Sequence, residues 1–351
     1  MIKNNFKDKT ILITGASGSI GSALVKKFLK TKCKVVRALS NDENGMFYLS
    51  RQIEEANILN FNKNMYKNRI RYLIGDVRDY KRNLQACSGV DIVVHAAAMK
   101  HVDICEYNKE EAKKTNIHGT NALIKAAAKN KVKFFLFIST DKAVDPNSVM
   151  GKSKLDAEKI VLKNNNKYMK CSSIRFGNVI GSRGSVLPFF LKQIKNKKEL
   201  FVTDKRATRF FTTINYASNE VLNTIQIMRG NELFLINNMK SIKIFDLANA
   251  LKKIFNYSKN IKFTKLKKGE KLHESLIEDK YNRYLKKEKN LIFINLTNKK
   301  NSSDNKKKIK YNSENKNLRL NQIIKFLIKE VQVKKHYEAI INDNFNIWLI
   351  N

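Results

Sequence analysis

The first half of the chain alternates short apolar runs with longer stretches in which apolar residues recur at helical spacing. The runs are rich in Val, Ile, Leu and Phe, which is typical of parallel strands buried on both faces. Repeated β-α units predict an α/β fold with a doubly wound parallel sheet that binds ligands at the carboxyl ends of its strands. The predicted strands are residues 10–15, 33–39, 70–76, 91–98, 133–140 and 170–181, and the predicted helices include 19–31, 115–130 and 151–163.

The pattern changes after about residue 185, where longer loops and mixed elements replace the repeat. Residues 232–237 are apolar enough to return to the sheet as a further strand. Residues 286–318 are dominated by Lys, Asn and Ser, which predicts a mobile surface loop or a weakly ordered insertion. An amphipathic helix is predicted over 318–331, and the tail that holds Trp348 is interpreted as a packing or oligomerisation element.

The composition is that of a globular protein, because 42% of the 351 residues are hydrophobic. No apolar run is long enough for a membrane-spanning helix, and the N-terminus has no signal-peptide core, so we expect neither a membrane span nor export. The four cysteines form no CxxC pair, which favours reduced thiols and a cytoplasmic location. The five histidines form no metal-like cluster, so no metal site is predicted.

The chain is strongly basic, with 69 Lys and Arg against 31 Asp and Glu and a formal net charge of +38. Such a charge favours anionic partners: nucleic acid, an anionic membrane or a phosphorylated small molecule. The lysines are spread along the whole chain among asparagines, however, and no nucleic-acid-binding motif accompanies them. We interpret them as solvated faces, and we expect only weak, salt-sensitive polyanion binding and no specific nucleic-acid partner.

A glycine-rich turn joins the first predicted strand to the first predicted helix, in the sequence TGASGSIGSAL. Gly15, Gly18 and Gly21 lack a Cβ, so the backbone N–H groups can approach a pyrophosphate, and the helix N-terminus adds partial positive charge. The strand before the turn, and the helix and next strand after it, make this spacing a specific signal for a dinucleotide. A Rossmann-like domain is therefore predicted.

The end of the second predicted strand bears on which nicotinamide dinucleotide is bound. Ser40 is small and neutral, and Arg37 lies nearby, which favours NADP over NAD; a loop that brings Asp42 into contact would favour NAD instead. Asp76 follows the third strand, where its carboxylate can bond the adenine amino group. Residues 95–98 place small side chains beside the cofactor.

Seven motifs occur in one order between residue 10 and about residue 285. Together they resemble the extended short-chain dehydrogenase/reductases of bacterial polysaccharide synthesis. The resemblance is strongest to the inverting UDP-N-acetylglucosamine 4,6-dehydratases of capsule, O-antigen and flagellar-glycan pathways. The motifs are TGASGSIGSAL, GDVRD, HAAAMKHVDICEYN, TNIHGTNALI, ISTDKAVDPNSVMGKSK, RFGNVIGSRGSVLPFF and GEKLHESL.

The resemblance implies a chemistry in which a hydride leaves sugar C4, water is lost across C5 and C6, and the hydride returns to C6. It also implies roles for four residues: Lys154 holds the nicotinamide ribose, Thr140 lies near O4, Asp141 acts as the acid for the C6 hydroxyl, and Lys142 acts as the base at C5. Thr-Asp-Lys matches the inverting pattern. As a base, Lys142 needs a pKa lowered by partial burial near Lys154 or by the cationic nicotinamide.

Met150 departs from the usual short-chain dehydrogenase pattern, which has Tyr four residues before the Lys. A thioether cannot transfer a proton, so Met150 cannot deprotonate O4. The sequence resembles a capsule-type subgroup with Met-x-x-x-Lys, which counts against a 4-epimerase. Asp141, Lys142 or a water near Lys100 or His101 are the candidate proton acceptors.

The resemblance also indicates which residues bind the two ligands. Arg209 is interpreted as a diphosphate fork, with Lys271 and Glu274 as further candidates. The residues expected at the cofactor are Gly15, Ser17, Gly18, Ser19, Ile20, Gly21, Ser40, Asn41, Asp76, Val77, Ala96, Ala97, Ala98, Lys100 and Lys154. The residues expected at the UDP-sugar are Lys100, Asn178, Ser185, Val186, Pro188, Thr203, Arg209 and Glu270.

These expectations divide the chain into three parts. Residues 1–182 form an NADP-binding domain whose sheet is completed by 232–250, 183–285 form a smaller nucleotide-sugar-binding region, and 286–351 form a variable basic loop and helical tail. The predicted function is an inverting NADP-dependent lyase acting on UDP-N-acetylglucosamine. A 4-epimerase and a catalytically silent nucleotide-binding protein are the alternatives, and the resemblance implies a homo-oligomer.

Overall fold

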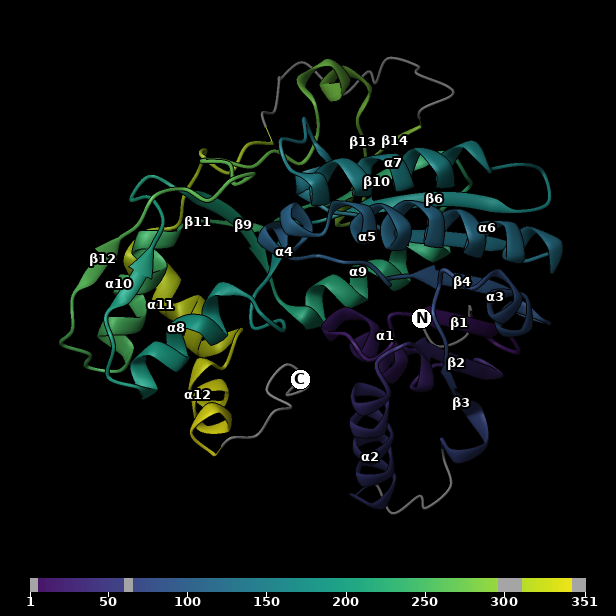
Figure 1. The fold of residues 1–351 in the computed structure, drawn as a ribbon, viewed down its shortest axis with the longest axis horizontal. Coiled ribbons are helices and arrows are strands. Elements are labelled where there is room, and N and C mark those ends of the chain that lie inside the picture. The colour runs from purple at the N-terminus through teal and green to yellow at the C-terminus, as the bar shows by residue number, and fades with distance from the viewer. Residues whose placement is uncertain (1–5, 60–65, 296–310, 343–351) are drawn as a thin grey trace.

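The computed structural model describes residues 6–59, 66–295 and 311–342. Within these residues nine strands form one sheet in the order β3-β2-β1-β4-β5-β6-β10-β14-β13 (Figure 1). The strands from β3 to β10 are mutually parallel, whereas β14 and β13 are antiparallel to their neighbours. The strands are β1 Thr10–Thr14, β2 Val35–Ser40, β3 Ile70–Ile74, β4 Ile92–His95, β5 Phe134–Ile138, β6 Lys170–Arg175, β10 Glu232–Ile236, β13 Lys286–Glu288 and β14 Leu291–Asn295.

Helices cover both faces of this sheet, because successive residues of its central strands point to opposite sides. Ile11 and Ile13 pack with residues of α1 and α9, whereas Leu12 packs with residues of α3, α6 and α7 on the other face. The predicted doubly wound fold is thereby confirmed. The covering helices are α1 Ser19–Leu29, α2 Glu43–Leu59 and α9 Ile214–Ile227 on one face, and α3 Tyr80–Cys87, α6 Gly119–Lys129 and α7 Val149–Lys163 on the other.

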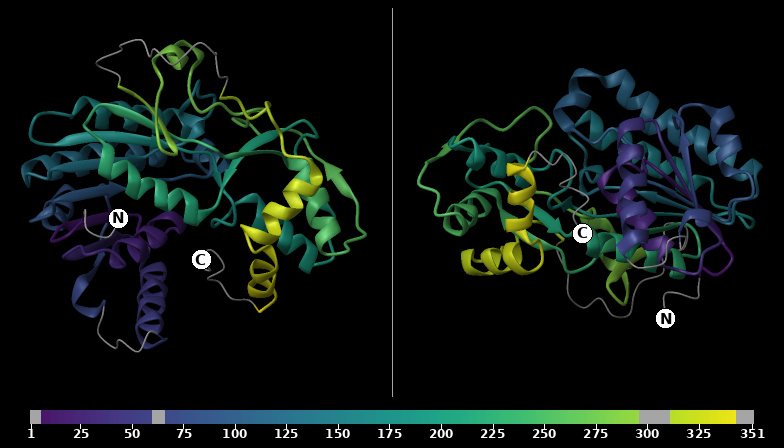
Figure 2. Two further views of the ribbon diagram at one scale, coloured as in Figure 1. Left: turned by 180° about the vertical axis from the view of Figure 1, so that it is seen from behind. Right: turned by 90° about the horizontal axis from the view of Figure 1, so that it is seen from below.

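A second group of elements lies to one side of the sheet around its own apolar core (Figures 1 and 2). Four helices contribute to this core, and two small sheets accompany them, in the orders β11-β9-β7 and β12-β8. The elements of this group are β7 Asn178–Val179, α8 Val186–Lys195, β8 Leu200–Val202, β9 Thr208–Thr212, β11 Lys240–Lys243, α10 Ile244–Ile254, β12 Ile261–Phe263, α11 Leu320–Lys329 and α12 Val333–Ile341.

Two predicted strands differ in extent from the observed ones. The segment 170–181 is not one strand, because the chain leaves the main sheet after Arg175 and β7 pairs with β9 instead. Of the segment 232–250, only β10 completes the main sheet, since β11 pairs with β9. The boundary between the two groups of elements therefore passes directly after β6 and again after β10.

The prediction of a loop over 286–318 is wrong for its first part. Residues 286–288 and 291–295 form a hairpin at the edge of the sheet, and Leu291, Ile292 and Ile294 are buried. Residues 296–310 and Trp348 lie outside the described residues. The helix predicted over 318–331 is confirmed as α11. Within the part of the chain that the structure describes, no helix combines the length and apolar character needed to cross a bilayer.

Candidate active site

A cavity of about 750 Å³ opens at the carboxyl ends of β1, β4 and β5, next to the point between β1 and β4 where the strand order reverses. It brings the glycine-rich turn and the segment 139–154 to one site. The predicted residues that line it are Gly15, Ser17, Gly18, Ser19, Ile20, Gly21, Ser40, Asn41, Asp76, Val77, Ala96, Ala97, Ala98, Lys100, Thr140, Lys142, Met150, Lys154, Asn178 and Ser185.

The glycine-rich turn is shaped by two close backbone approaches. Gly15 has a φ of +64°, and a Cβ there would lie 2.8 Å from the Cα of Ala97. A Cβ on Gly21 would lie 2.1 Å from the carbonyl oxygen of Gly15. Both positions therefore require glycine, and the turn folds back tightly onto the start of α1.

The N-terminus of α1 offers free backbone donors to this cavity. Its N-cap is Gly18, no side chain caps the helix, and its first turn holds no acidic residue. The first N–H groups of a helix have no partner within the helix and carry partial positive charge. A cradle that a Cβ would fill, beside an uncapped helix N-terminus, fits the pyrophosphate of a dinucleotide.

The end of β2 presents the neutral Ser40 and Asn41 and the carboxylate of Asp42 to the cavity. Ser40 Oγ is hydrogen-bonded to Ser17 Oγ at 2.8 Å. Asp42 accepts from the backbone N–H of Gly45 and pairs with Arg183 at 3.1 Å. Burial alone would raise the pKa of Asp42, but these donors lower it overall.

Arg37 does not line the cavity, because its guanidinium donates to the carbonyl of Ala86 at 2.8 Å. The expectation that Arg37 is the cation beside the cofactor is therefore wrong, and the guanidinium at this end belongs to Arg183. Arg183 lies within a recognised motif, but only the fold brings it to β2. Asp76, expected at the adenine, accepts hydrogen bonds from both the backbone and the guanidinium of Arg78.

Lys154 reaches the cavity from α7 and is 6% exposed. Its ammonium donates to the carbonyl of Ile138 at 2.6 Å and lies 4.1 Å from the ring centroid of Phe137. Burial lowers the pKa of Lys154 to about 7, and the charge of Glu158 only partly opposes this. Lys154 therefore carries a large neutral fraction at neutral pH. Lys100, also at the cavity wall, carries a smaller one, because burial and then the charge of Arg183 lower its pKa to about 8.

Met150 is also buried at the cavity wall. It packs with Cys105 and Ala112, and with the partly buried Met99 and Val149. Its surroundings are apolar, so the position at which related dehydrogenases have Tyr is here part of a small hydrophobic cluster.

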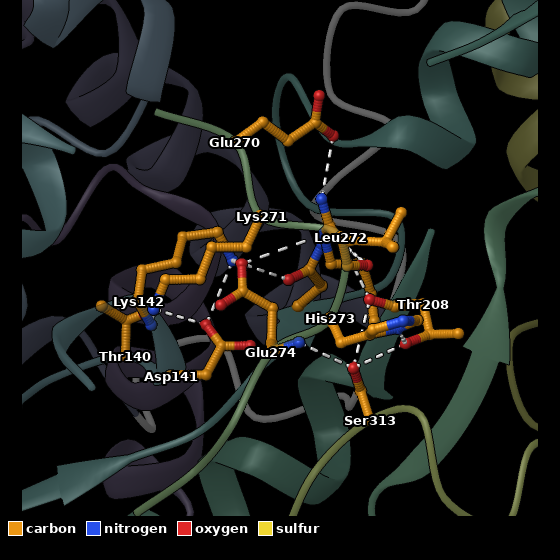
Figure 3. Close-up of polar contacts among 12 residues, drawn as sticks. Thr140, Asp141, Lys142, Thr208, Glu270, Lys271, Leu272, His273, Glu274 and Ser313 are labelled. Carbon is orange, nitrogen blue, oxygen red and sulfur yellow. Dashed lines mark hydrogen bonds and ion pairs between the residues drawn. The ribbon is translucent and has the colours of Figure 1, made fainter. Parts of the chain in front are cut away.

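Lys142 lies between two carboxylates, as Figure 3 shows. Its Nζ is 3.1 Å from Asp141 Oδ1 and 3.6 Å from Glu274 Oε1, and it also donates to Asn178 Oδ1 at 3.1 Å. Thr140 donates its hydroxyl proton to Asp141 Oδ1 at 2.9 Å. The Lys142 side chain is 21% exposed, against 0% for Asp141 and 2% for Glu274, so Lys142 is the member of this triad that lines the cavity.

The environment of Lys142 differs from the expectation of a lowered pKa. Burial lowers the pKa, but the negative charges of Asp141 and Glu274 outweigh it and raise the pKa above that of an ordinary lysine. The cation that lowers the pKa of Lys142 is Arg209, and not Lys154 as expected. Sequence analysis predicts Glu274 only as a substrate-binding candidate, because its contact with Lys142 is formed by the tertiary fold.

Arg209 is occupied by protein groups. Its guanidinium is 6% exposed, lies 2.9 Å from Glu270 and 4.0 Å from Glu274, and donates to the carbonyls of Thr208 and Leu272. Thr203 donates to Glu270 at 3.3 Å. The structure thus brings three predicted substrate residues together, but away from the cavity wall. The predicted residues absent from the cavity lining are Asp141, Val186, Pro188, Thr203, Arg209, Glu270, Lys271 and Glu274.

Two buried hydroxyls of the cavity wall have no hydrogen-bond partner among the described residues. They are Ser139 Oγ, at the end of β5, and Ser185 Oγ, at the N-cap of α8. Buried polar atoms are nearly always satisfied, so these two indicate a polar ligand in the cavity. Ser139 had not been singled out, although it directly precedes Thr140.

The fold and cavity define a Rossmann-type α/β protein with a dinucleotide cradle. Residues 11–296 match the family described as polysaccharide biosynthesis proteins, and the chain belongs to this family. An inverting UDP-N-acetylglucosamine 4,6-dehydratase of Campylobacter jejuni is 42% identical over 278 residues, which cover 78% of each chain. A UDP-glucose 4-epimerase of Rickettsia canadensis is 39% identical over 78% of each chain. A Methanocaldococcus jannaschii protein, named as an uncharacterized membrane protein, is 39% identical over 94% of this chain and 98% of its own.

Solved structures agree with this fold. The X-ray structure of Pen from Bacillus thuringiensis superposes with a TM-score of 0.84 and 35% identity, covering 93% of this chain and 99% of the other. The dTDP-glucose 4,6-dehydratase DesIV of Streptomyces venezuelae, solved with NAD bound, has a TM-score of 0.69 over 78% of this chain and 90% of its own. At 21% identity the second comparison shows the fold alone.

Proposed function

We propose that this protein is an NADP-dependent nucleotide-sugar 4,6-dehydratase, a lyase. It converts UDP-N-acetylglucosamine to a UDP-2-acetamido-2,6-dideoxy-4-keto-hexose with inversion at C5, for polysaccharide or glycan synthesis. The observation that carries the proposal is that Thr140, Lys142 and Lys154 line the same cavity as the glycine-rich turn. The similarity to a named inverting dehydratase supports it.

The chain's own residues provide the proton transfers. A nicotinamide dinucleotide in the cradle supplies a hydride acceptor that is restored within each turnover. Lys154, with its pKa lowered to about 7 by burial, takes the O4 proton that Met150 cannot take. Lys142 is the side chain of its triad that reaches the cavity, so we assign to its amine the removal of the C5 proton. Inversion requires the new proton to reach C5 from the opposite face. The acid role implied for Asp141 requires a route through Lys142 or Thr140, because Asp141 is fully buried.

NADP is the proposed dinucleotide. Ser40 and Asn41 are neutral, and the carboxylate of Asp42, which would repel a 2′-phosphate, is already paired with Arg183. This arrangement tolerates a phosphate on the adenosine ribose better than a free carboxylate would.

A UDP-sugar 4-epimerase is the second candidate, favoured by the relative named UDP-glucose 4-epimerase. A 4-epimerase needs proton transfer at O4 but none at C5, and it leaves the mass of the sugar unchanged. Lys142 and its buried carboxylates have no assignment in that reaction.

Incubation of the purified chain with UDP-N-acetylglucosamine in D2O, with NADP well below the substrate concentration, separates these functions. A dehydratase that inverts C5 gives a product that has lost water and gained one solvent deuteron at C5, with many turnovers per cofactor. A product of unchanged mass without deuterium supports the epimerase. No conversion in the presence of bound NADP supports the silent nucleotide-binding protein.

A further inference from the structure

The segment Leu272–Leu276, here called the strap, places Glu274 beside Lys142. Hydrogen bonds to Ser313 and Thr208 hold the strap on the side away from Lys142. Ser313 Oγ accepts from the backbone N–H of Glu274 at 2.8 Å, and the N–H of Ser313 donates to the Glu274 carbonyl at 2.8 Å. Thr208 Oγ1 lies 2.8 Å from both Ser313 Oγ and His273 Nδ1 (Figure 3). This network holds the backbone of Glu274 in the position from which its carboxylate reaches Lys142.

The two carboxylates of the triad are held differently. Asp141 Oδ1 receives two hydrogen bonds, from Thr140 and Lys142. Glu274 Oε1 lies 3.6 Å from Lys142 and 4.0 Å from Arg209, which are ion-pair distances too long for hydrogen bonds. The second oxygens, Asp141 Oδ2 and Glu274 Oε2, are both buried without a hydrogen-bond partner among the described residues, so the difference lies in the first oxygens. Glu274 is thus the less stabilised of the two anions.

We propose that Glu274 stores the proton that Lys142 must release before its amine can act as a base. An N–H bond of the Lys142 ammonium breaks and an O–H bond forms on Glu274, which leaves a neutral amine beside a neutral carboxyl without exchange with solvent. Lys142 then passes the C5 proton to the departing C6 hydroxyl, which leaves as water, and Glu274 returns the stored proton to the amine. The proposal rests on the dehydratase function, and Glu274 is a positioning residue because it acts only through Lys142.

The charges around the pair are consistent with such a transfer. The charged groups that face it are Asp141, before α7, Arg209, from β9, and Lys271, directly before the strap. Burial raises the pKa of Glu274, and Asp141 adds to this, whereas Lys142, Arg209 and Lys271 oppose it. A cationic ligand beside Lys142 disfavours the ammonium and so favours the neutral pair.

The pH dependence of turnover in Glu274→Gln tests this proposal. Both proteins titrate with Lys154 near pH 7, so the comparison is made above that pKa. With an internal proton acceptor, wild-type kcat is nearly flat from about pH 8 upward; without one, Lys142 loses its proton to solvent, so kcat of the variant continues to rise by about tenfold per pH unit below the pKa of Lys142. Glu274→Asp, which keeps a carboxylate, restores part of the flat profile. A Glu274→Gln profile parallel to wild type, lowered by a constant factor, would overturn the proposal and leave Glu274 a structural role.

A second measurement needs neither cofactor nor substrate. The pH dependence of Lys142 acetylation by acetic anhydride, followed by mass spectrometry of its peptide, reports the midpoint of the lysine. We expect the midpoint to fall by about one pH unit or more in Glu274→Gln, because an adjacent anion is lost. Glu270→Gln is the matched control. It neutralises a nearby carboxylate, but Glu270 pairs with Arg209 and not with Lys142. The Lys142 midpoint in this variant should stay near the wild-type value.

The two readouts separate the failure of the inference from the failure of the function. An unchanged Lys142 midpoint in Glu274→Gln would contradict the coupling of Glu274 to Lys142, whatever the enzyme catalyses. If the Lys142 midpoint shifts but the protein makes no keto-sugar, Glu274 is coupled to Lys142 and the dehydratase function is wrong. The proton-storing role is then wrong as well.

Discussion

Lys154 lies one helical turn beyond Met150 on α7, and both side chains line the same cavity. Lys154 is bonded to the carbonyl of Ile138, whereas Met150 packs with Cys105 and Ala112. The helix therefore places a titratable amine and an inert thioether side by side. The site therefore has a group that can accept a proton near neutral pH, although Met stands where the usual Tyr would be.

Replacement of Met150 by Leu tests whether the thioether has any chemical role. Leu is apolar and similar in volume, so the cluster around position 150 is kept at a cost below about 1.5 kcal/mol. We expect kcat within about threefold of wild type. A folded Met150→Leu protein that has lost about a hundredfold or more would show that the sulfur takes part in the reaction.

Replacement of Met150 by Tyr tests whether the missing phenol would help. Tyr is larger and polar, and at a 4% exposed position it should lower the free energy of unfolding by about 1–3 kcal/mol. We expect no gain in kcat, because the phenol has no place in a cluster packed for Met. Urea titration measures the cost, and a several-fold gain in turnover would contradict the assignment of the O4 proton to Lys154.

Lys154→Met should lower kcat by about a hundredfold or more, because it removes the proposed proton acceptor. It should also stabilise the fold at neutral pH. The pKa of Lys154 falls from 10.5 to about 7 on folding, so the unfolded chain binds a proton that the folded chain does not bind in this range. The stability of wild type relative to Lys154→Met should therefore rise by about 1.4 kcal/mol per pH unit through that window.

Urea denaturation of wild type and Lys154→Met at pH values across that window checks the sign, since other titrations cancel in the difference. A stability difference that does not change with pH would mean that Lys154 titrates normally. The role of Lys154 as a base near neutral pH would then be lost.

Ser40→Asp should reverse the choice of dinucleotide. A carboxylate at the end of β2 repels a 2′-phosphate and accepts the ribose hydroxyls of NAD. We expect the affinity for NADPH, followed by fluorescence titration, to fall by about tenfold or more relative to that for NADH. A wild-type protein that binds NADH more tightly than NADPH would contradict the proposed cofactor before any mutation is made.

The buried pair of Arg175 and Glu158 should be important for stability. Arg175 is 2% exposed, bonds Glu158 at 3.0 and 2.7 Å, and joins β6 to α7. Arg175→Met should destabilise the fold by about 3–5 kcal/mol, because Glu158 is left as an unpaired buried charge. Arg51→Met, which breaks an exposed pair with Glu54, is the control and should cost no more than about 1 kcal/mol.

The sequence predicted the cradle and the segment 140–154 well, because both signals are local. Gly15 and Gly21 can be read from their spacing after a strand, and Lys154 from its spacing after Met150. The hairpin of β13 and β14 was missed because the lysines around it hid the short apolar run of 291–295. Its burial depends on pairing with β10, which local composition does not reveal.

The partners of Lys142 could not be predicted for a related reason. Its protonation depends on Glu274, which is distant in sequence and is brought to it by the Ser313 network. Arg209 was predicted to bind a diphosphate, but the anion that its guanidinium engages in the structure is the carboxylate of Glu270. The diphosphate role of Arg209, the division into domains and self-association stay predictions.

The most direct test of the account is the identity and C5 configuration of the product formed from UDP-N-acetylglucosamine, determined by mass spectrometry and NMR. The account predicts a 4-keto-6-deoxy sugar nucleotide that is lighter by one water and inverted at C5. UDP-N-acetylgalactosamine as the sole product, or a 4-keto-6-deoxy product with C5 retained, would contradict it.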